Sequence, residues 1–159
     1  ALAMAAPASA QSVSTIDQTG SGNAATVAQT DINASDVDQV GNDNIANVEQ
    51  TGGSGNNSDI DQNSLGAIAD VRQIGTDNTS TINQVDGSTI STTGIVPQDP
   101  EAFVRQTGAN NESTINQSAE APSYNLVASV TQTNDDNVSD VQQDIIDNSI
   151  AGSQRALVT

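Results

Sequence analysis

Glutamine recurs in this chain at intervals close to eleven residues, and this recurrence limits the possible folds more than any other feature. From Gln18 onward the successive intervals are 11, 10, 11, 12, 11, 11, 22, 11, 15 and 11 residues. The glutamines that define these intervals are Gln18, Gln29, Gln39, Gln50, Gln62, Gln73, Gln84, Gln106, Gln117, Gln132 and Gln143. Such a period predicts a repeat architecture, in which each unit packs mainly on its neighbours.

Each of these glutamines closes a short motif. The residue four positions before it is always serine or alanine, and the residue two before it is always isoleucine or valine. These β-branched residues are Ile16, Val27, Val37, Val48, Ile60, Val71, Ile82, Val104, Ile115, Val130 and Val141. The residue six positions before glutamine is usually asparagine, namely Asn23, Asn33, Asn44, Asn56, Asn78, Asn111 and Asn137. The four motif positions therefore recur as one set.

The motif positions lie two residues apart, which is the spacing of side chains on one face of a β-strand. Glycine, asparagine and aspartate between the motifs predict tight turns, because these residues tolerate a positive φ. The chain has 27 isoleucine and valine residues against 4 leucines, which favours strands over helices. Each unit therefore predicts one short strand followed by a turn, with the motif side chains pointing inward.

A single strand of this kind buries one β-branched residue and is not stable alone. Two facing strands make a thin layer, and layers stacked at about 4.8 Å place glutamine on glutamine and asparagine on asparagine. Buried amides are costly unless they are paired, and a stacked amide donates to one neighbour and accepts from the other. We therefore expect an all-β fold, a cross-β β-solenoid with two strands per 22-residue turn and about six layers.

The repeats do not cover the chain evenly. Residues 1–10 end in Ala8-Ser9-Ala10, a pattern typical of a signal-peptide cleavage site, so we interpret them as a signal-peptide remnant outside the fold. Thirteen units are counted between Gln18 and Gln154, two of them degenerate. The expected segments are repeats at 11–84, a degenerate repeat with a proline-containing loop at 85–100, repeats at 101–154 with a short insertion at 118–125, and a tail at 155–159.

The composition excludes several classes of function. The chain has no cysteine and no histidine, which excludes zinc fingers, thiol nucleophiles and histidine-dependent triads. It has 3 basic and 20 acidic residues, and a net charge of -17 opposes binding to nucleic acid or anionic lipid. No apolar run reaches the roughly 20 residues that span a bilayer. We expect no enzyme activity, no cofactor, no metal, no nucleic-acid partner and no membrane insertion.

The acidic residues form outward columns in the expected register. Asp17, Asp38 and Asp61 share the position before glutamine, and Asp36 and Asp59 share the position three before it. Carboxylates stacked at about 4.8 Å repel one another. We interpret them as a solvated surface that opposes aggregation before export. Bridging by calcium, which prefers oxygen ligands, is the alternative.

The repeat resembles the curlin repeat, the unit of the curli fibres of bacteria with an outer membrane. The pattern of that family is Ser-x5-Gln-x-Gly-x-Gly-Asn-x-Ala-x3-Gln. Later repeats keep its frame with departures such as Ser64 for glycine and Ala67 for asparagine, and the likeness spans about residues 12–143. The first repeat matches the whole pattern, at Ser12, Gln18, Gly20, Gly22, Asn23, Ala25 and Gln29.

This resemblance implies a secreted structural subunit of an extracellular amyloid fibre. Curli subunits leave the cell unfolded through a dedicated outer-membrane pore and polymerise on the cell surface, where the pilus-like fibres form biofilm matrix and mediate adhesion. The implied partners are further copies of the chain, the secretion pore and a nucleator subunit. The repeat occurs in major subunits and in nucleators, so the choice between these two roles stays open.

The residues alone leave a second class of function open, a monomeric solenoid that binds ice, calcium or a surface as an adhesin. Outward threonines such as Thr15 and Thr81 alternate with aspartate, so they form no continuous ice-binding array. No helix or polar cap is evident at either end of the repeats, so the terminal strands would expose unpaired backbone groups. Such ends template the addition of another copy and favour a filament.

Overall fold

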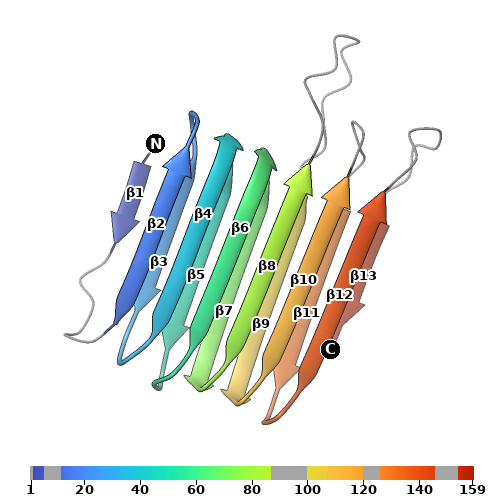
Figure 1. Ribbon diagram of the computed structural model, residues 1–159. Coiled ribbons are helices and arrows are strands. Elements are labelled where there is room, and N and C mark those ends of the chain that lie inside the picture. Colours follow the sequence, from blue (N-terminus) through green and yellow to red (C-terminus); the bar gives the residue numbers. More distant parts are fainter. Residues whose placement is uncertain (1, 6–11, 87–99, 120–125, 146–153) are drawn as a thin grey trace.

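The computed structural model describes residues 2–5, 12–86, 100–119, 126–145 and 154–159. Every regular element within these residues is a β-strand, and the strands form two parallel sheets that face each other (Figure 1). The even sheet comprises β2 (Val13–Thr19), β4 (Ala34–Asn42), β6 (Asn57–Leu65), β8 (Thr79–Asp86), β10 (Glu112–Ala119) and β12 (Val138–Ile145). The odd sheet comprises β1 (Leu2–Ala5), β3 (Ala24–Gln29), β5 (Ile45–Thr51), β7 (Ile68–Thr76), β9 (Glu101–Ala109), β11 (Leu126–Thr133) and β13 (Gln154–Val158).

Consecutive strands alternate between the two sheets, and equivalent positions of successive repeats stack. In the even sheet, Ile60 pairs with Val37 on one side and with Ile82 on the other. In the odd sheet, Val48 pairs with Val71. The pairs β2–β3 to β12–β13 form six layers of a parallel β-solenoid, and the predicted fold class is confirmed.

The apolar core is a narrow column between the sheets. It consists of the inward isoleucine and valine residues of both sheets, with buried alanines such as Ala69 and Ala102 beside them. Each strand from β2 to β13 contributes one inward β-branched residue, and burial of such a side chain is worth about 1.5–3 kcal/mol. Ordering a single residue costs about 1–2 kcal/mol, so no layer is stable without the layers above and below it.

Across the long interval between Gln84 and Gln106, the described strands of each sheet pair directly, β8 with β10 and β7 with β9. β8 ends at Asp86 and β9 begins at Glu101, while Gln73 of β7 pairs directly with Gln106 of β9. Among the described residues, the expected degenerate repeat at 85–100 therefore supplies no strand between these pairs, and its first two residues complete β8. Residues 87–99 lie outside the described part of the chain.

Two other expected boundaries also move. Ser118 and Ala119, assigned to a short insertion, complete β10, and the rest of that insertion, residues 120–125, is not described. Gln154, which ends the thirteenth expected unit, pairs with Leu126, six positions before Gln132, so the expected end of a unit at Gln154 is wrong. Residues 155–158, expected to be a tail, belong to β13.

Residues 2–5 lie in the fold, although residues 1–10 were expected to lie outside it. They form β1, which pairs in parallel with β3 from Leu2 opposite Ala24 to Ala5 opposite Val27. An edge strand presents unpaired backbone groups that attract another strand. The cleavage pattern at residues 8–10 does not indicate this pairing, which depends on the open edge of β3.

The turns stack as closely as the strands do. Gly75 and Gly108 occupy equivalent turn positions with φ values of 122° and 125°. A Cβ atom on Gly75 would lie 2.0 Å from the carbonyl oxygen of Gly108, and one on Gly108 would lie 2.1 Å from that of Asn134. Glycine is required there because the backbone of the next layer fills the space that a side chain would take.

We predict that Gly75→Ala destabilises the solenoid at least about twice as much as Gly52→Ala. Both glycines have positive φ, which costs about 1–2 kcal/mol for a residue with a side chain. At Gly52, however, the nearest atom to a new Cβ is 3.6 Å away, so no clash with the next layer is added. Urea denaturation of the freshly purified chain measures both free energies of unfolding, and equal losses would contradict backbone stacking at Gly75.

Candidate functional site: the amide columns and the open ends

The structure places the predicted inward residues between the two sheets. Ten of the eleven glutamines are buried, and Gln18 on the edge strand β2 is half-buried. Six of the seven asparagines are buried and Asn137 is half-buried, again next to an edge. Ten of the eleven β-branched residues are buried, and Ile16 of β2 is half-buried. The only partly exposed members therefore lie in the terminal layers.

The glutamine side chains form a continuous hydrogen-bonded ladder in each sheet. In the even sheet, Nε2 of Gln39 donates to Oε1 of Gln62 over 2.8 Å, and Gln62 donates to Gln84 over 2.9 Å. In the odd sheet, Gln50 donates to Gln73 over 2.7 Å. All nine ladder bonds run in the same direction, from the N-terminal layer to the next, over 2.6–3.0 Å.

The second amide hydrogen of each buried glutamine crosses to the other sheet. Nε2 of Gln39 donates to the backbone oxygen of Ala24 over 3.1 Å, and Nε2 of Gln50 donates to that of Ala34 over 2.9 Å. The same bond recurs at the other buried ladder glutamines. Each glutamine thus joins layers along the stack and also joins the two sheets. The sequence analysis missed this second bond, since no residue pattern marks a backbone acceptor.

The asparagines of the even sheet form a second ladder with the opposite direction. Oδ1 of Asn56 accepts from the backbone nitrogen of Asn78 over 3.1 Å and from its Nδ2 over 2.9 Å. Asn78 accepts from Asn111 in the same way, and Asn111 accepts from Asn137. In this ladder the donor lies in the more C-terminal layer. Each asparagine Oδ1 also accepts from the backbone N–H of the next asparagine, so this buried N–H is not left without a partner.

The asparagine column of the odd sheet stops where alanine and then proline replace asparagine in successive layers, and these two substitutions compensate each other. Asn44 accepts from the backbone nitrogen of Ala67 over 3.0 Å, but Ala67 has no side-chain oxygen for the layer that follows. The residue of that layer is Pro100, which has no backbone N–H and needs no acceptor. Its carbonyl oxygen still accepts from Ile68 over 2.9 Å. Pro100, the last residue of the expected proline-containing loop, therefore fits the stack.

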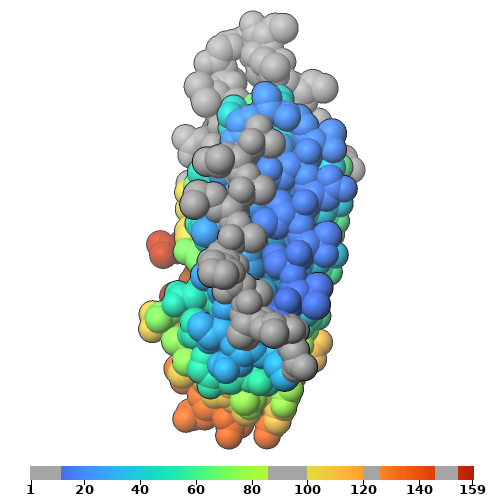
Figure 2. Space-filling model, turned by 90° about the vertical axis from the view of Figure 1, so that its left-hand side faces the viewer, coloured from blue at the N-terminus to red at the C-terminus, as the bar shows by residue number. Residues whose placement is uncertain are grey.

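The even sheet is open at both ends within the described residues, while β1 pairs with the outer edge of β3 in the odd sheet. β2 and β12 are the edge strands of the even sheet, and no described element covers either of them. Val13 of β2 is 63% exposed and Val138 of β12 is 74% exposed. Figure 2 looks onto the β2 end, where the dark blue atoms of this strand lie at the surface. Gln18 presents an amide oxygen at this end, and Gln143 presents an amide nitrogen at the other.

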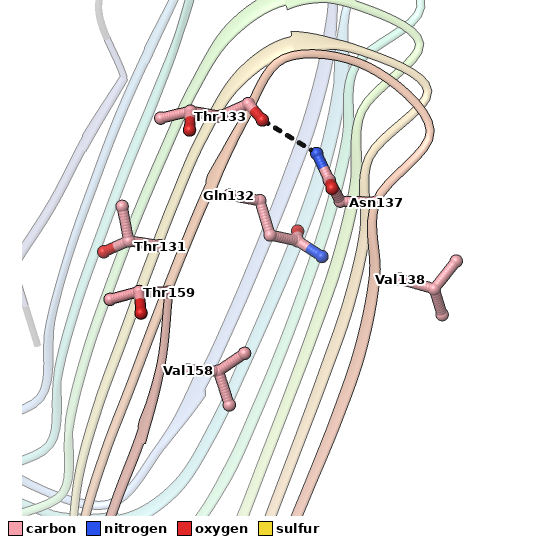
Figure 3. A pocket seen from close by; sticks show the side chains of 7 residues that line it. All are labelled: Thr131, Gln132, Thr133, Asn137, Val138, Val158 and Thr159. Carbon is pink, nitrogen blue, oxygen red and sulfur yellow. Dashed lines mark hydrogen bonds between the residues drawn. The ribbon is translucent and has the colours of Figure 1, made fainter.

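A hollow of about 240 Å³ lies at the C-terminal end, between the last residues of β11 and the start of β12 (Figure 3). β13 pairs with β11 only as far as Val130, so the next residues of β11 line this hollow. Gln132 is 5% exposed and points its amide into the hollow, while Nδ2 of Asn137 donates to the carbonyl oxygen of Thr133 over 2.9 Å. The hollow is lined by backbone and side-chain amide groups, which could form hydrogen bonds with a further strand.

The outer face of the even sheet is strongly acidic. Its exposed strand positions carry no arginine and eight acidic residues, Asp17, Asp36, Asp38, Asp59, Asp61, Glu112, Asp140 and Asp144. Five of them stack on β2, β4 and β6 in the predicted columns. Burial, and then the neighbouring charges of Asp61, Asp17 and Asp36, raise the pKa of Asp38. Burial and the charges of Asp36 and Asp61 raise the pKa of Asp59.

The outer face of the odd sheet has mixed charge and carries all three arginines. Nε of Arg72 donates to Oε2 of Glu49 on the neighbouring strand over 2.9 Å, as the repeat register predicts. Both side chains are about half exposed, so this pair adds little to stability. Arg105 and Arg155 are exposed on β9 and β13. The acidic columns therefore occupy one sheet only.

The described residues contain no candidate metal site and no candidate membrane-spanning helix. No group of three or more acidic side chains among them is arranged to hold a metal ion. They also contain no helix of the length and apolarity needed to cross a bilayer. Comparison with protein-family models, with curated proteins and with solved structures gave no match.

We predict that Gln73→Leu lowers the free energy of unfolding by about 3 kcal/mol or more, because it leaves buried amide groups of Gln50 and Gln106 without partners at about 1–3 kcal/mol each. Gln142→Leu is the matched control, since Gln142 points outward and is exposed. Urea denaturation measures both changes. A loss below about 1 kcal/mol for Gln73→Leu would contradict the role of the ladder in stability.

We predict that mild acid stabilises the solenoid. Asp38 and Asp59 have a folded-state pKa above the ordinary value of 3.8, so the folded chain binds more protons than the unfolded chain between these values. The free energy of unfolding therefore rises as the pH falls from neutral through the raised pKa values, and this gain levels off below 3.8. The double variant Asp38→Asn with Asp59→Asn should be more stable at pH 7 and show a smaller rise.

The double variant Asp140→Asn with Asp144→Asn is the matched control for this pH dependence. It removes the same charge from the same sheet, but Thr114 and Ser118 are the neighbours of these two aspartates on β10. Urea denaturation at pH 7, 5 and 4 measures the effect. An equal reduction of the pH dependence in both double variants would contradict the stacked columns as its origin.

Proposed function

We propose that this chain is a structural subunit that polymerises into a fibre by end-to-end stacking of its layers. The observation that carries this proposal is the pair of open edges of the even sheet, β2 and β12, where in-register backbone and amide columns have no described cover. The β2 end presents the amide oxygen of Gln18, which accepts, and the β12 end presents the amide nitrogen of Gln143, which donates. This difference arises because the glutamine ladder has one direction throughout the stack. A second copy of the chain is the partner that matches this arrangement best.

The register of the even sheet specifies how β12 of one copy meets β2 of the next. Val13 of β2 and Val138 of β12 belong to the same column of the even sheet. Continuing this register sets Gln143 against Gln18 and Asp140 against Thr15. Gln142 then meets Asp17, so no two like charges meet in this strand pair. A head-to-head contact would join two β2 edges that both present the amide oxygen of Gln18, so the glutamine ladder could not continue across it, which favours the head-to-tail arrangement.

The resemblance to the curlin repeat extends the proposal to the cell. We propose a secreted, extracellular curli-like fibre that contributes to biofilm matrix and adhesion, with a secretion pore and a nucleator subunit as partners. A net charge of -17 opposes collapse of the chain before export. After export, the same chain gains its stability from stacking. The roles of major subunit and nucleator both fit this proposal.

The first test is assembly of the purified chain, which is expected to form fibres that bind an amyloid dye and diffract at about 4.8 Å. A folded chain that stays monomeric for days at high concentration would contradict the proposal. That result would favour a monomeric binding solenoid instead.

We predict that Gln142→Pro stops fibre growth from the β12 end. The carbonyl oxygen of Asn137 accepts from Glu112, and neighbouring residues of a strand alternate in direction, so the N–H of Gln142 faces the open edge. Proline there removes a donor to an incoming strand while the pairing of β12 with β10 is kept. Added at about one tenth of the wild-type concentration, the variant should join growing ends and block them.

Gln142→Ala is the control, because it changes the same side chain and keeps the backbone donor. Dye fluorescence and electron microscopy of fibre length measure the effect. Fibres of normal length in the presence of Gln142→Pro would contradict growth through the edge of β12.

A further inference from the structure

The two sheets hold unequal numbers of strands, seven in the odd sheet and six in the even sheet. From β2 onward, every layer takes one strand from each sheet. The surplus strand is β1, which lies beyond β3 at the N-terminal end of the odd sheet. In the described residues, nothing lies beyond β2 on the even sheet.

β1 occupies the same register as the last strand of the odd sheet, β13. Ala3 pairs with Ala25 of β3, and Ala156 of β13 pairs with Ala128 of β11. Ala25 and Ala128 are equivalent positions in one column, four residues before their ladder glutamines. Residues 2–5 read Leu-Ala-Met-Ala and residues 155–158 read Arg-Ala-Leu-Val, so both have alanine at this position and a long apolar residue after it.

We infer that the outer edge of β3 is the docking site for β13 of a second copy, and that β1 occupies this site within its own chain. This inference rests on the proposed function. When β12 of one copy pairs with β2 of the next, their layer partners are β13 and β3, which must then lie side by side. The expected pairs are Ala156 with Ala25 and Val158 with Val27.

A retained β1 prevents this junction. It inserts one extra strand, about 4.8 Å, into the odd sheet but none into the even sheet. In all six layers, glutamine side chains donate to the backbone of the facing sheet and hold the two sheets in register. The odd sheet therefore cannot shift by one strand spacing relative to the even sheet at a junction between two copies. β1 therefore acts as a self-cap. Its four residues pair with β3 alone, and its removal or displacement frees the edge.

The experiment compares the full chain with the double variant Ala3→Pro with Met4→Pro. Alternate residues of a strand face opposite edges, so this variant removes one β1 amide that faces β3 whichever of the two it is. Ala3→Ser with Met4→Leu is the control that keeps both amides. Two quantities are measured for each chain: the lag time of fibre formation, and hydrogen exchange of the β3 amides in the freshly dissolved monomer.

The proline variant is expected to shorten the lag several-fold and to speed exchange in β3, while the control behaves as the wild type. A lag that is unchanged or longer in the proline variant would overturn the self-cap. If no chain forms fibres, the proposed function fails and docking of β13 fails with it. Exchange in β3 then decides separately, because equal exchange in the wild type and the proline variant would show that β1 does not cover β3.

Discussion

The side-chain amide ladder is the interaction on which the rest of this structure depends. Each layer buries too little apolar surface to hold itself together, and buried amides are costly unless both hydrogens find acceptors. Only an in-register stack provides these acceptors, one on the next glutamine and one on the backbone of the facing sheet. The eleven-residue period, the parallel pairing and the glycines at the tightest turns all follow from the need to keep these amides aligned.

The same constraint gives the solenoid a direction and leaves its ends unfinished. The glutamine ladder runs toward the C-terminal layer and the asparagine ladder runs the other way, so the two ends differ in the donors and acceptors that they present. A globular core has no free edge, whereas the last layer of a hydrogen-bonded stack keeps donors and acceptors that can pair with a further layer. The acidic columns lie on the outer face of one sheet, and β1 covers one edge of the other sheet.

Much of this architecture is readable from sequence, because a period of two inside a period of eleven leaves few ways to fold. The alignment of Gln18 with Gln39, and of Glu49 with Arg72, follows from counting residues. The register is not predicted where an interval changes: β7 pairs directly with β9 although Gln73 and Gln106 lie 33 residues apart, and Gln154 aligns with Leu126 and does not end a thirteenth unit. The cross-sheet bonds and the pairing of Leu2–Ala5 were also out of reach, since both depend on backbone groups that become available only after folding.

A high-resolution electron cryomicroscopy map of the assembled fibre tests the central claim most directly. The account predicts one unbroken glutamine ladder per sheet, with layers about 4.8 Å apart and Gln143 of one copy donating to Gln18 of the next. A map in which copies meet through another surface, or in which the glutamine columns are out of register at the junction, would contradict it.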